Sequence, residues 1–504
     1  MNFIQHMLDE IQSKPDAIRI IDCSSNRPEF IDGKTLYQRV MQLGEHLVAS
    51  GLDQDAVIGI VMSNSADWVI ADLACLAFGY TTLPLPLGFS RYQAEFLANR
   101  CSAFLVDTKG KQVLEEKWEL ATLNAICVKE VYQHAHPHPT GTRQTRSADW
   151  VCKIIHTSGT TSRPKGVKQS LGGLSVMLHS LLERVPRPIH KHYLSLVPLS
   201  LLIEQVTAVY LPLLSGGKIQ FLPPTVPLIG EPNVDMQALI TRVIDCGATA
   251  MTVPPVMLEA LLARVENDTA LASYFKTNLH ITAGGAPVSA RALERLERLG
   301  ITVYEGYGLS ENGSVISVST AQARKIGSVG KPLAHVEVRI NSEGRIEIRS
   351  ASIFAGYSWV DPSACQVGAD GWLDTGDLGQ IDEDGFLYVI GRAKNLICLP
   401  NGRNVSPEQV EMSFREQPGV KEAILYLGTN AELTVALVVS PHFDVEQVKQ
   451  WSKEWFSEVE RPQELRVLHE DAPLLQALAT KTLIEKRRIL TAAAAEEHEA
   501  ASTH

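Results

Sequence analysis

A short polar stretch at residues 155–167 carries residue types that bind phosphate. It reads I-H-T-S-G-T-T-S-R-P-K-G-V and follows apolar residues that predict a strand. Glycine lets the backbone approach a ligand closely, backbone N–H and hydroxyl groups can donate to an anion, and Lys165 adds a positive charge. A flexible linker does not normally follow a strand and end in Pro-Lys-Gly. Because a Walker A loop ends in Gly-Lys-Ser/Thr, we expect a triphosphate loop of another kind.

A second stretch, residues 301–311, places an aromatic ring, a hydroxyl and a carboxylate close together after a predicted strand. Tyr307 can stack on a base, and Glu311 can bind Mg²⁺ because this ion prefers oxygen ligands. Asp377, in the sequence T-G-D, is suited to accept hydrogen bonds from ribose hydroxyls. Each pattern alone also fits an ordinary hairpin or turn. The three patterns together predict a site for a nucleotide with Mg²⁺.

These motifs resemble, in the same order and at similar spacing, those of the adenylate-forming superfamily, and they are closest to AMP-forming medium- and long-chain acyl-CoA synthetases. The phosphate loop is similar except that Ser162 stands where the family usually has Gly. Y-G-L-S-E and T-G-D match two further motifs. G-R-A-K-N-L-I at 391–397 and G-R-N-V-S-P-E at 402–408 match the hinge segment. The resemblance covers nearly the whole chain.

The resemblance implies a role for each motif. Thr160, Lys165 and Glu311 would act in catalysis, and Glu311 and Thr160 would hold Mg²⁺. Contacts to the nucleotide and movements at the hinge would involve Thr157, Ser158, Gly159, Thr161, Gly284, Gly285, Ala286, Tyr307, Gly308, Ser310, Asp377, Arg392, Lys394 and Gly402. Lys394 would be the pivot of a C-terminal domain, and the Gly402 loop would move in for thioester formation. The implied cofactors are ATP, Mg²⁺ and CoA, the last as acceptor.

The family also has a lysine near its C-terminus that neutralises charge as the acyl-adenylate forms. In an ungapped match Ile484 occupies the position of this lysine. Lys481 lies three residues before it and Lys486 two residues after it, and both are candidates. A protein that binds nucleotide or acyl groups without catalysis is therefore an alternative to an active enzyme.

Residues 193–206 indicate the kind of acid. Pro198, Leu199 and Glu204 match a passage of long-chain acyl-CoA synthetases, whereas Leu201 replaces the usual histidine. The acidic residue with which amino-acid-activating domains hold the substrate amine has no clear equivalent. We therefore expect an apolar acyl or aryl acid to attack ATP, release pyrophosphate and pass from acyl-AMP to CoA. Transfer to an acyl carrier protein, an amine or an internal nucleophile is the alternative.

The motifs need a framework of alternating strands and helices to position them. Residues 36–50 and 68–78 have helical spacing and residues 56–62 form an apolar run, which predicts a mostly parallel sheet. The expected fold is α/β, with an N-terminal AMP-binding domain of layered α/β subdomains at residues 1–391. This domain includes a β-barrel or sandwich at about residues 325–390. A small mobile α+β lid, residues 392–504, follows a hinge near residues 391–394.

Composition bounds the remaining possibilities. The 504 residues, 45% hydrophobic and 20% charged, are typical of a globular protein with more than one core. A formal net charge of −11 disfavours nucleic acid as a partner. The eight cysteines stand singly, the N-terminus lacks a signal-peptide pattern, and the most apolar segment is interrupted by prolines and an aspartate. We expect a cytoplasmic protein without a transmembrane segment, and its oligomeric state is left open.

Overall fold

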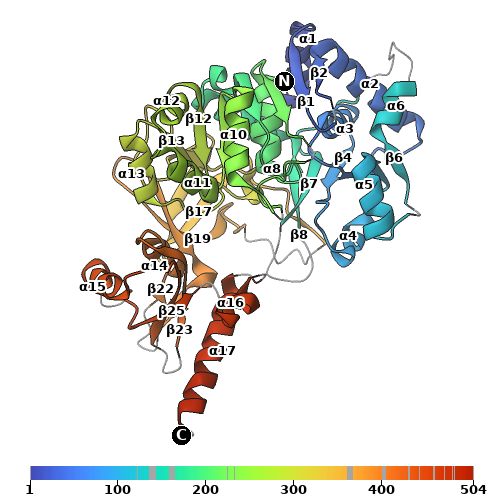
Figure 1. Cartoon of the computed structure of the whole chain (residues 1–504). Coiled ribbons are helices and arrows are strands. Elements are labelled where there is room, and N and C mark those ends of the chain that lie inside the picture. The colour runs from blue at the N-terminus through green and yellow to red at the C-terminus, as the bar shows by residue number, and fades with distance from the viewer. Residues whose placement is uncertain are drawn as a thin grey trace. The chain divides into compact units, whose positions relative to one another are not determined.

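The computed structural model divides into two compact units. Figure 1 shows the whole chain, coloured from the N-terminus to the C-terminus. Unit 1 comprises Met1–Val288, Ala292–Val338 and Ile348–Leu373, and unit 2 comprises Ser289–Arg291, Arg339–Glu347 and Asp374–His504. The structure describes residues 2–25, 27–121, 123–134, 143–157, 165–223, 225–231, 233–359, 367–399, 404–428, 432–441, 443–457, 460–469, 472–479, 481 and 483–502. The boundary between the compact units does not show where one part of the chain rotates against another. The domain boundary at residue 391 and the hinge near residues 391–394 therefore stay predictions.

The first sheet of unit 1 has seven strands in the order β18-β8-β7-β4-β3-β5-β6. Their bounds are β3 (Val57–Val61), β4 (Thr81–Pro84), β5 (Ala103–Val106), β6 (Ala125–Cys127), β7 (Val151–Thr157), β8 (Lys165–Ser170) and β18 (Tyr357–Ser358). The strands from β7 to β6 are parallel neighbours, whereas β8 is antiparallel to both β7 and β18. The apolar run at residues 56–62 thus forms a buried parallel strand, as predicted.

The second sheet of unit 1 has nine strands in the order β15-β14-β13-β12-β11-β9-β10-β1-β2. Their bounds are β1 (Ile18–Asp22), β2 (Glu29–Asp32), β9 (His192–Leu194), β10 (Lys218–Phe221), β11 (Ala250–Val253), β12 (His280–Ala283), β13 (Val303–Tyr307), β14 (Ser317–Val318) and β15 (Lys331–Pro332). The strands from β13 to β1 are parallel neighbours. Their carboxyl ends therefore meet at one edge, where ligands bind in open α/β sheets.

Helices surround these sheets. They are α1 (Phe3–Ser13), α2 (Gly33–Ala49), α3 (Ala66–Phe78), α4 (Arg91–Ala98), α5 (Thr108–Gln112), α6 (Val128–His134), α7 (Leu171–Arg184), α8 (Leu202–Glu204), α9 (Leu211–Leu214), α10 (Met236–Cys246), α11 (Pro255–Val265), α12 (Thr269–Asn278) and α13 (Ala290–Arg298). In α3 every residue except Asp67 is buried, which explains its mostly apolar composition, and the buried Asp72 is paired with Lys153. The Ser65 hydroxyl accepts a hydrogen bond from the N–H of Trp68, and Gly79 ends the helix at φ 80°. The predicted helix at residues 68–78 is thereby confirmed.

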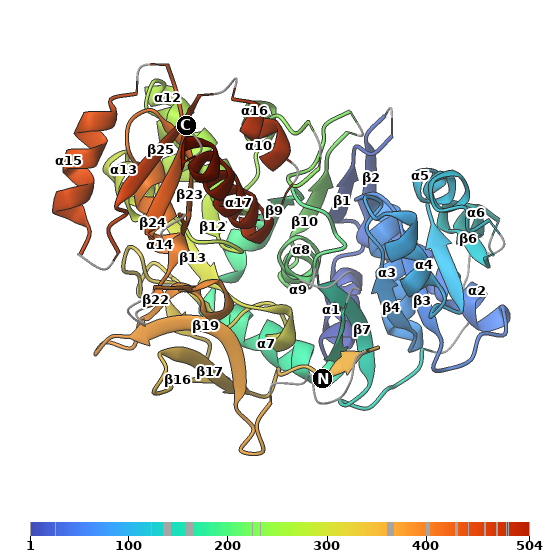
Figure 2. The same ribbon diagram turned by 90° about the horizontal axis from the view of Figure 1, so that it is seen from below.

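The strand-rich segment forms a four-stranded sheet in the order β16-β17-β19-β20, where β16 is Val336–Ile340, β17 is Arg345–Ser350, β19 is Leu373–Ile381 and β20 is Leu387–Arg392. Unit 2 also contains β21 (Ile397–Cys398), β22 (Asn404–Val405), β23 (Val420–Leu427), β24 (Leu433–Val439), β25 (Glu464–His469), α14 (Pro407–Arg415), α15 (Val445–Trp455), α16 (Pro473–Leu478) and α17 (Leu483–Ser502). Figure 2 shows β23, β24 and β25 side by side, as their pairing requires. Their apolar side chains form a core of their own.

Candidate active site

The predicted phosphate loop joins the two strands of an antiparallel hairpin. Thr157 at the end of β7 pairs with Lys165 at the start of β8, so the hairpin register sets where the loop begins and ends. The side chain of Thr157 and the residues Ser158, Gly159, Thr160 and Thr161 lie outside the described part of the structure.

His156, one residue before the end of β7, was not singled out by the sequence. Its ring meets that of Phe89 edge to face with centroids 4.7 Å apart. Burial lowers the pKa of His156 to about 4, so the imidazole is neutral at physiological pH. Its Nε2 atom is buried without a hydrogen-bond partner among the described residues. A neutral polar atom thus lies next to the predicted loop.

Glu311 lies in a single 3₁₀ turn, η4 (Ser310–Asn312), just after β13. The Tyr357 hydroxyl donates to its Oε1 atom at 2.7 Å, and the Phe354 N–H donates to its backbone carbonyl at 2.9 Å. The Gln169 side chain donates to the carbonyl of Ser310 at 2.5 Å. Strand β18 and strand β8 therefore hold this turn in place.

Lys165 approaches the same tyrosine. Its Nζ atom lies 5.2 Å from the centroid of the Tyr357 ring, within the range of a cation–π contact. The structure thus brings together Lys165 and Glu311, which are 146 residues apart in the chain (311 − 165). The sequence reasoning missed Tyr357, and its one local signal is an aromatic residue after a glycine in a predicted strand region.

The predicted glycine turns follow two neighbouring parallel strands. Gly284 follows β12, and a Cβ atom added there would lie 2.7 Å from the carbonyl oxygen of Gly306 on β13. Gly285 has φ 81°, which glycine adopts at no steric cost, and Ala286 is exposed. Tyr307 ends β13, and at Gly308 an added Cβ would lie 1.9 Å from the carbonyl oxygen of Ser314. The structure places these two turns at one edge of the sheet.

The stretch after β9 contains a buried carboxyl group. Glu204 is 1% exposed, and its Oε1 atom accepts hydrogen bonds from the Ser195 hydroxyl at 2.7 Å and the Leu196 N–H at 3.1 Å. Burial raises the pKa of Glu204 to about 8, so the group is mostly protonated at neutral pH. Leu201, at the position where the resemblance has a histidine, is 42% exposed.

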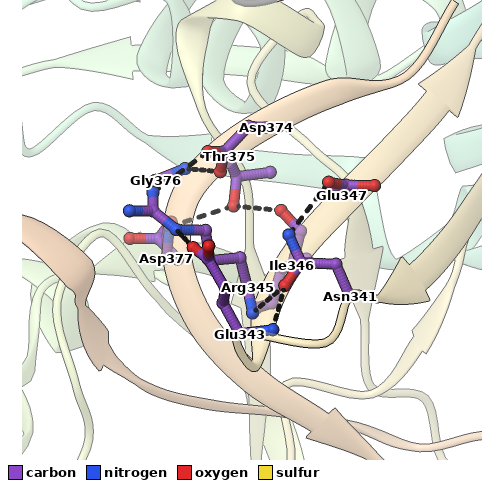
Figure 3. A network of polar contacts seen from close by, with 9 residues as sticks. All are labelled: Asn341, Glu343, Arg345, Ile346, Glu347, Asp374, Thr375, Gly376 and Asp377. Carbon is purple, nitrogen blue, oxygen red and sulfur yellow. Dashed lines mark hydrogen bonds and ion pairs between the residues drawn. The ribbon is translucent and has the colours of Figure 1, made fainter. Parts of the chain in front are cut away.

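In unit 2 the T-G-D motif lies on β19 and is braced by a polar network (Figure 3). The Thr375 hydroxyl donates to the Ile346 carbonyl at 2.8 Å and accepts from the Asp377 N–H at 3.1 Å. Asp377 is 3% exposed and its Oδ1 atom lies 2.7 Å from Nε of Arg392, the residue opposite it on β20. The structure therefore pairs the two residues predicted to bind the ribose and phosphate.

The predicted hinge segment is anchored on both sides of Lys394. Lys394 is exposed in the 3₁₀ turn η6 (Ala393–Asn395). Asn395 donates to Glu408 Oε1 at 2.6 Å, and Ser406 donates to the Ile390 carbonyl at 3.2 Å. Gly402 lies outside the described residues. Whether Lys394 is a pivot stays a prediction.

The two candidate lysines have different surroundings in unit 2. Lys486, on α17, forms an ion pair of 2.6 Å with Glu422 on β23, and its side chain is 15% exposed. Arg487 next to it pairs with the buried Glu411 at 2.8 Å. Lys481 precedes α17 and is exposed, and no ion pair of its side chain is found among the described residues. The structure therefore gives Lys486 a role in attaching α17 to the sheet.

Of the two predicted Mg²⁺ ligands, Glu311 lies in the described part of the structure, and Thr160 lies outside it. The searched, described residues contain no group of three or more His, Cys, Asp or Glu side chains placed to hold a metal. Mg²⁺ usually keeps several waters and takes one or two carboxylates together with the phosphates of its substrate. Glu311 fits that requirement as a single carboxylate, because its Oε1 atom accepts from Tyr357 and its Oε2 atom has no partner among the described residues.

The glycine turns lie at the ends of parallel strands, and Lys165 at the predicted phosphate loop lies near the Glu311 carboxylate. This arrangement fits a nucleotide-binding α/β enzyme. A model of the family described as "AMP-binding enzyme" matches residues 9–358, more than half of the chain. The chain therefore belongs to the AMP-binding enzyme family.

Similar proteins support this assignment. A 2-succinylbenzoate–CoA ligase of Bacillus cytotoxicus is 27% identical over 504 residues, which cover 94% of this chain and 95% of that protein. The long-chain-fatty-acid–CoA ligase FadD15 of Mycobacterium bovis is 25% identical over 449 residues, 78% of this chain and 75% of that protein. The solved O-succinylbenzoate CoA synthetase of Bacillus subtilis with ATP and a magnesium ion has a TM-score of 0.75 and 22% identity, covering 92% and 95% of the two chains.

The predicted superfamily, the α/β fold and the enzyme class, an AMP-forming acid–CoA ligase acting on a small-molecule carboxylic acid, are confirmed. ATP, Mg²⁺ and CoA are general features of these similar proteins. Within the described residues, no helix combines the length and apolar character needed to cross a membrane.

Proposed function

We propose that the protein activates an apolar acyl or aryl carboxylic acid with Mg²⁺ and ATP and then transfers the acyl group to CoA. The two relatives are named as ligases for a long-chain fatty acid and for 2-succinylbenzoate, so similar proteins act on both acyl and aryl acids. Leu196, Leu199 and Leu202 are buried in the stretch after β9 and could contribute an apolar wall. A fatty acid as substrate would place the enzyme in fatty acid metabolism.

The observation that carries this proposal is the meeting of Lys165 and Glu311 at Tyr357. A cation at a phosphate loop can bind the phosphates, and a carboxylate close to it can hold the Mg²⁺ that bridges them. Tyr307 on β13 would stack on the base, as the sequence predicts. Asp377 and Arg392 would hold the ribose and phosphate, as the resemblance implies.

We infer that Lys481, rather than Lys486, supplies the positive charge for adenylate formation. The ion pair between Lys486 and Glu422 occupies the ammonium group of Lys486 and fixes it on β23. Lys481 is exposed, and it lies before α17, so its side chain is not committed to attaching that helix. Among the described residues Lys481 forms no ion pair, so its ammonium group can move toward an α-phosphate, whereas that of Lys486 would first have to leave Glu422.

Acid-dependent release of pyrophosphate from ATP tests the proposed reaction, across a panel of fatty and aryl acids with and without CoA. We expect release for at least one acid and a CoA thioester when CoA is present. Release without a thioester would instead support an acyl carrier protein, an amine or an internal nucleophile as acceptor. ATP binding without release from any acid would contradict the proposal and support a protein that has lost catalysis.

Two lysine variants test the assignment of Lys481. Lys481→Ala should slow pyrophosphate release on the order of 100-fold, as does removal of other groups that stabilise developing charge. Lys486→Ala should mainly lower the midpoint of thermal unfolding because it leaves Glu422 without its partner. A larger loss of pyrophosphate release in Lys486→Ala than in Lys481→Ala would assign the catalytic charge to Lys486.

A further inference from the structure

We propose that Tyr357 is a positioning residue that holds Glu311 and Lys165 in the arrangement needed for Mg²⁺ with ATP. This inference rests on the proposed function, in which Glu311 binds the metal and Lys165 the phosphates. Tyr357 contacts both groups: its hydroxyl donates to Glu311 Oε1 at 2.7 Å, and its ring faces Lys165 Nζ at 5.2 Å from the centroid.

The hydrogen bond orients the carboxylate without neutralising it. A glutamate side chain has several rotatable bonds, so a donor at Oε1 restricts where Oε2 can point. Because a phenol is an uncharged donor, it adds no positive charge that would compete with a divalent cation for the carboxylate. The described residues form no ion pair between Lys165 and Glu311 themselves. Tyr357 thus keeps the cation and the carboxylate close to one ring while each can still bind a ligand.

Tyr357 is itself held in place by the backbone. It pairs with Val167 in the β18–β8 ladder, and Gly356 before it accepts a hydrogen bond from the Lys168 N–H at 3.1 Å. The ring of Phe354 meets the Tyr357 ring edge to face with centroids 4.7 Å apart. The Phe354 N–H donates to the Glu311 carbonyl, so the same segment holds both the backbone and the side chain of Glu311.

The short strand β18 positions Tyr357 next to β8. It is only two residues long, and it adds a last strand to a sheet whose next strand begins with Lys165. The register between β18 and β8 brings the tyrosine of one strand to the lysine of the other. The segment therefore connects the phosphate-binding strand with the turn after β13, and its tyrosine completes that connection.

The test separates metal binding from activity by measuring nucleotide binding without acid. Titration calorimetry of Tyr357→Phe should show roughly tenfold weaker binding of ATP with Mg²⁺, because a hydrogen bond to an ionised acceptor contributes about that much. Binding of ATP in EDTA should change by less than about twofold, because the phenylalanine keeps the ring under Lys165. Tyr357→Leu, which removes the ring as well, should weaken both.

Tyr132→Phe is the matched control. In the wild type the Tyr132 hydroxyl also donates to a carboxylate, that of Asp67, away from the predicted site. The Tyr132→Phe variant should lose thermal stability. The ratio between its ATP affinity with Mg²⁺ and its ATP affinity in EDTA should stay that of the wild type. In the active enzyme, Tyr357→Phe should also need roughly tenfold more Mg²⁺ for half-maximal pyrophosphate release.

Three outcomes would contradict the inference. Tyr357→Phe could bind ATP with Mg²⁺ as tightly as the wild type, or it could lose binding equally with and without the metal, which would mean a general structural role. Either result, with a wild type that releases pyrophosphate, would overturn the positioning role and leave the proposed function standing. A wild type that binds no ATP with Mg²⁺ would overturn both.

Discussion

Glu204 should make the protein less stable as the pH rises above neutrality, and Glu204→Gln should remove that effect. The side chain is 1% exposed, and its Oε2 atom is buried without a hydrogen-bond partner among the described residues. Burial disfavours the ionised carboxylate, which raises the pKa from 4.5 to about 8. Glutamine resembles the protonated carboxyl group in shape and in having no charge.

The sign and size of the effect follow from proton binding. Between pH 4.5 and 8 the folded state holds a proton on Glu204 that the unfolded state has released. The stabilisation from this group is therefore complete below pH 4.5 and is lost as the pH rises toward 8, by up to about 1.4 kcal/mol per pH unit. Between pH 6.5 and 7.5 the loss should be about 1 kcal/mol. Glu305, 5% exposed and with its pKa raised to about 8, should contribute a similar loss.

The buried histidines contribute to the same pH dependence. Burial lowers the pKa of His156, His190 and His280 to about 4, so their contribution to stability changes mainly between pH 4 and about pH 7. That contribution has the opposite sign, because stability from a buried neutral histidine increases as the pH rises toward 6.5. Histidines in the unfolded chain are still about half protonated at pH 6.5, so the wild-type slope contains both contributions, and the difference between the Glu204→Gln and wild-type slopes reports Glu204.

The assay is reversible urea unfolding followed by circular dichroism at pH 6.5, 7.0 and 7.5. The free energy of unfolding of Glu204→Gln should fall with pH by about 1 kcal/mol less than that of the wild type over this range. Glu115→Gln is the control, because that exposed side chain is in water in both states. If Glu204→Gln and Glu115→Gln both show the wild-type pH dependence, Glu204 is ionised in the folded protein and the argument from its burial is wrong.

Three further predictions concern other parts of the structure. Lys153→Met should lower the free energy of unfolding by about 3–5 kcal/mol, because it leaves the Asp72 carboxylate buried without its ion-pair partner. Adding Asp72→Leu should restore most of that loss, and no recovery of stability would contradict the prediction. Gly284→Ala should cost about 1–3 kcal/mol and weaken ATP binding in calorimetry, because its Cβ would lie 2.7 Å from the Gly306 carbonyl oxygen, and unchanged binding would refute the close approach. Asp377→Asn should raise the KM for ATP in pyrophosphate release, because an amide offers one acceptor oxygen where the carboxylate offers two. An unchanged KM would exclude a role in nucleotide binding.

The local chemistry of the site could be read from short stretches of sequence. Each motif lies within a few residues of the chain: the small residues before Lys165, the aromatic residue that ends β13 with the carboxylate after it, and T-G-D. Mostly apolar stretches likewise predicted α3 and β3, because a buried helix and a buried parallel strand expose few of their side chains to water. Such features depend on neighbours in the chain, so the sequence by itself determines them.

Other features depend on which distant segments meet, and only the tertiary structure decided those. Tyr357 contacts Glu311 and Lys165 because β18 pairs with β8, and no local pattern specifies that pairing. Sequence spacing left Lys481 and Lys486 as equal candidates, and they differ because α17 packs on β23 and brings Lys486 to Glu422. Strand order and register result from many weak packing contributions summed over the whole chain, and a window of a few residues contains only a small part of that sum.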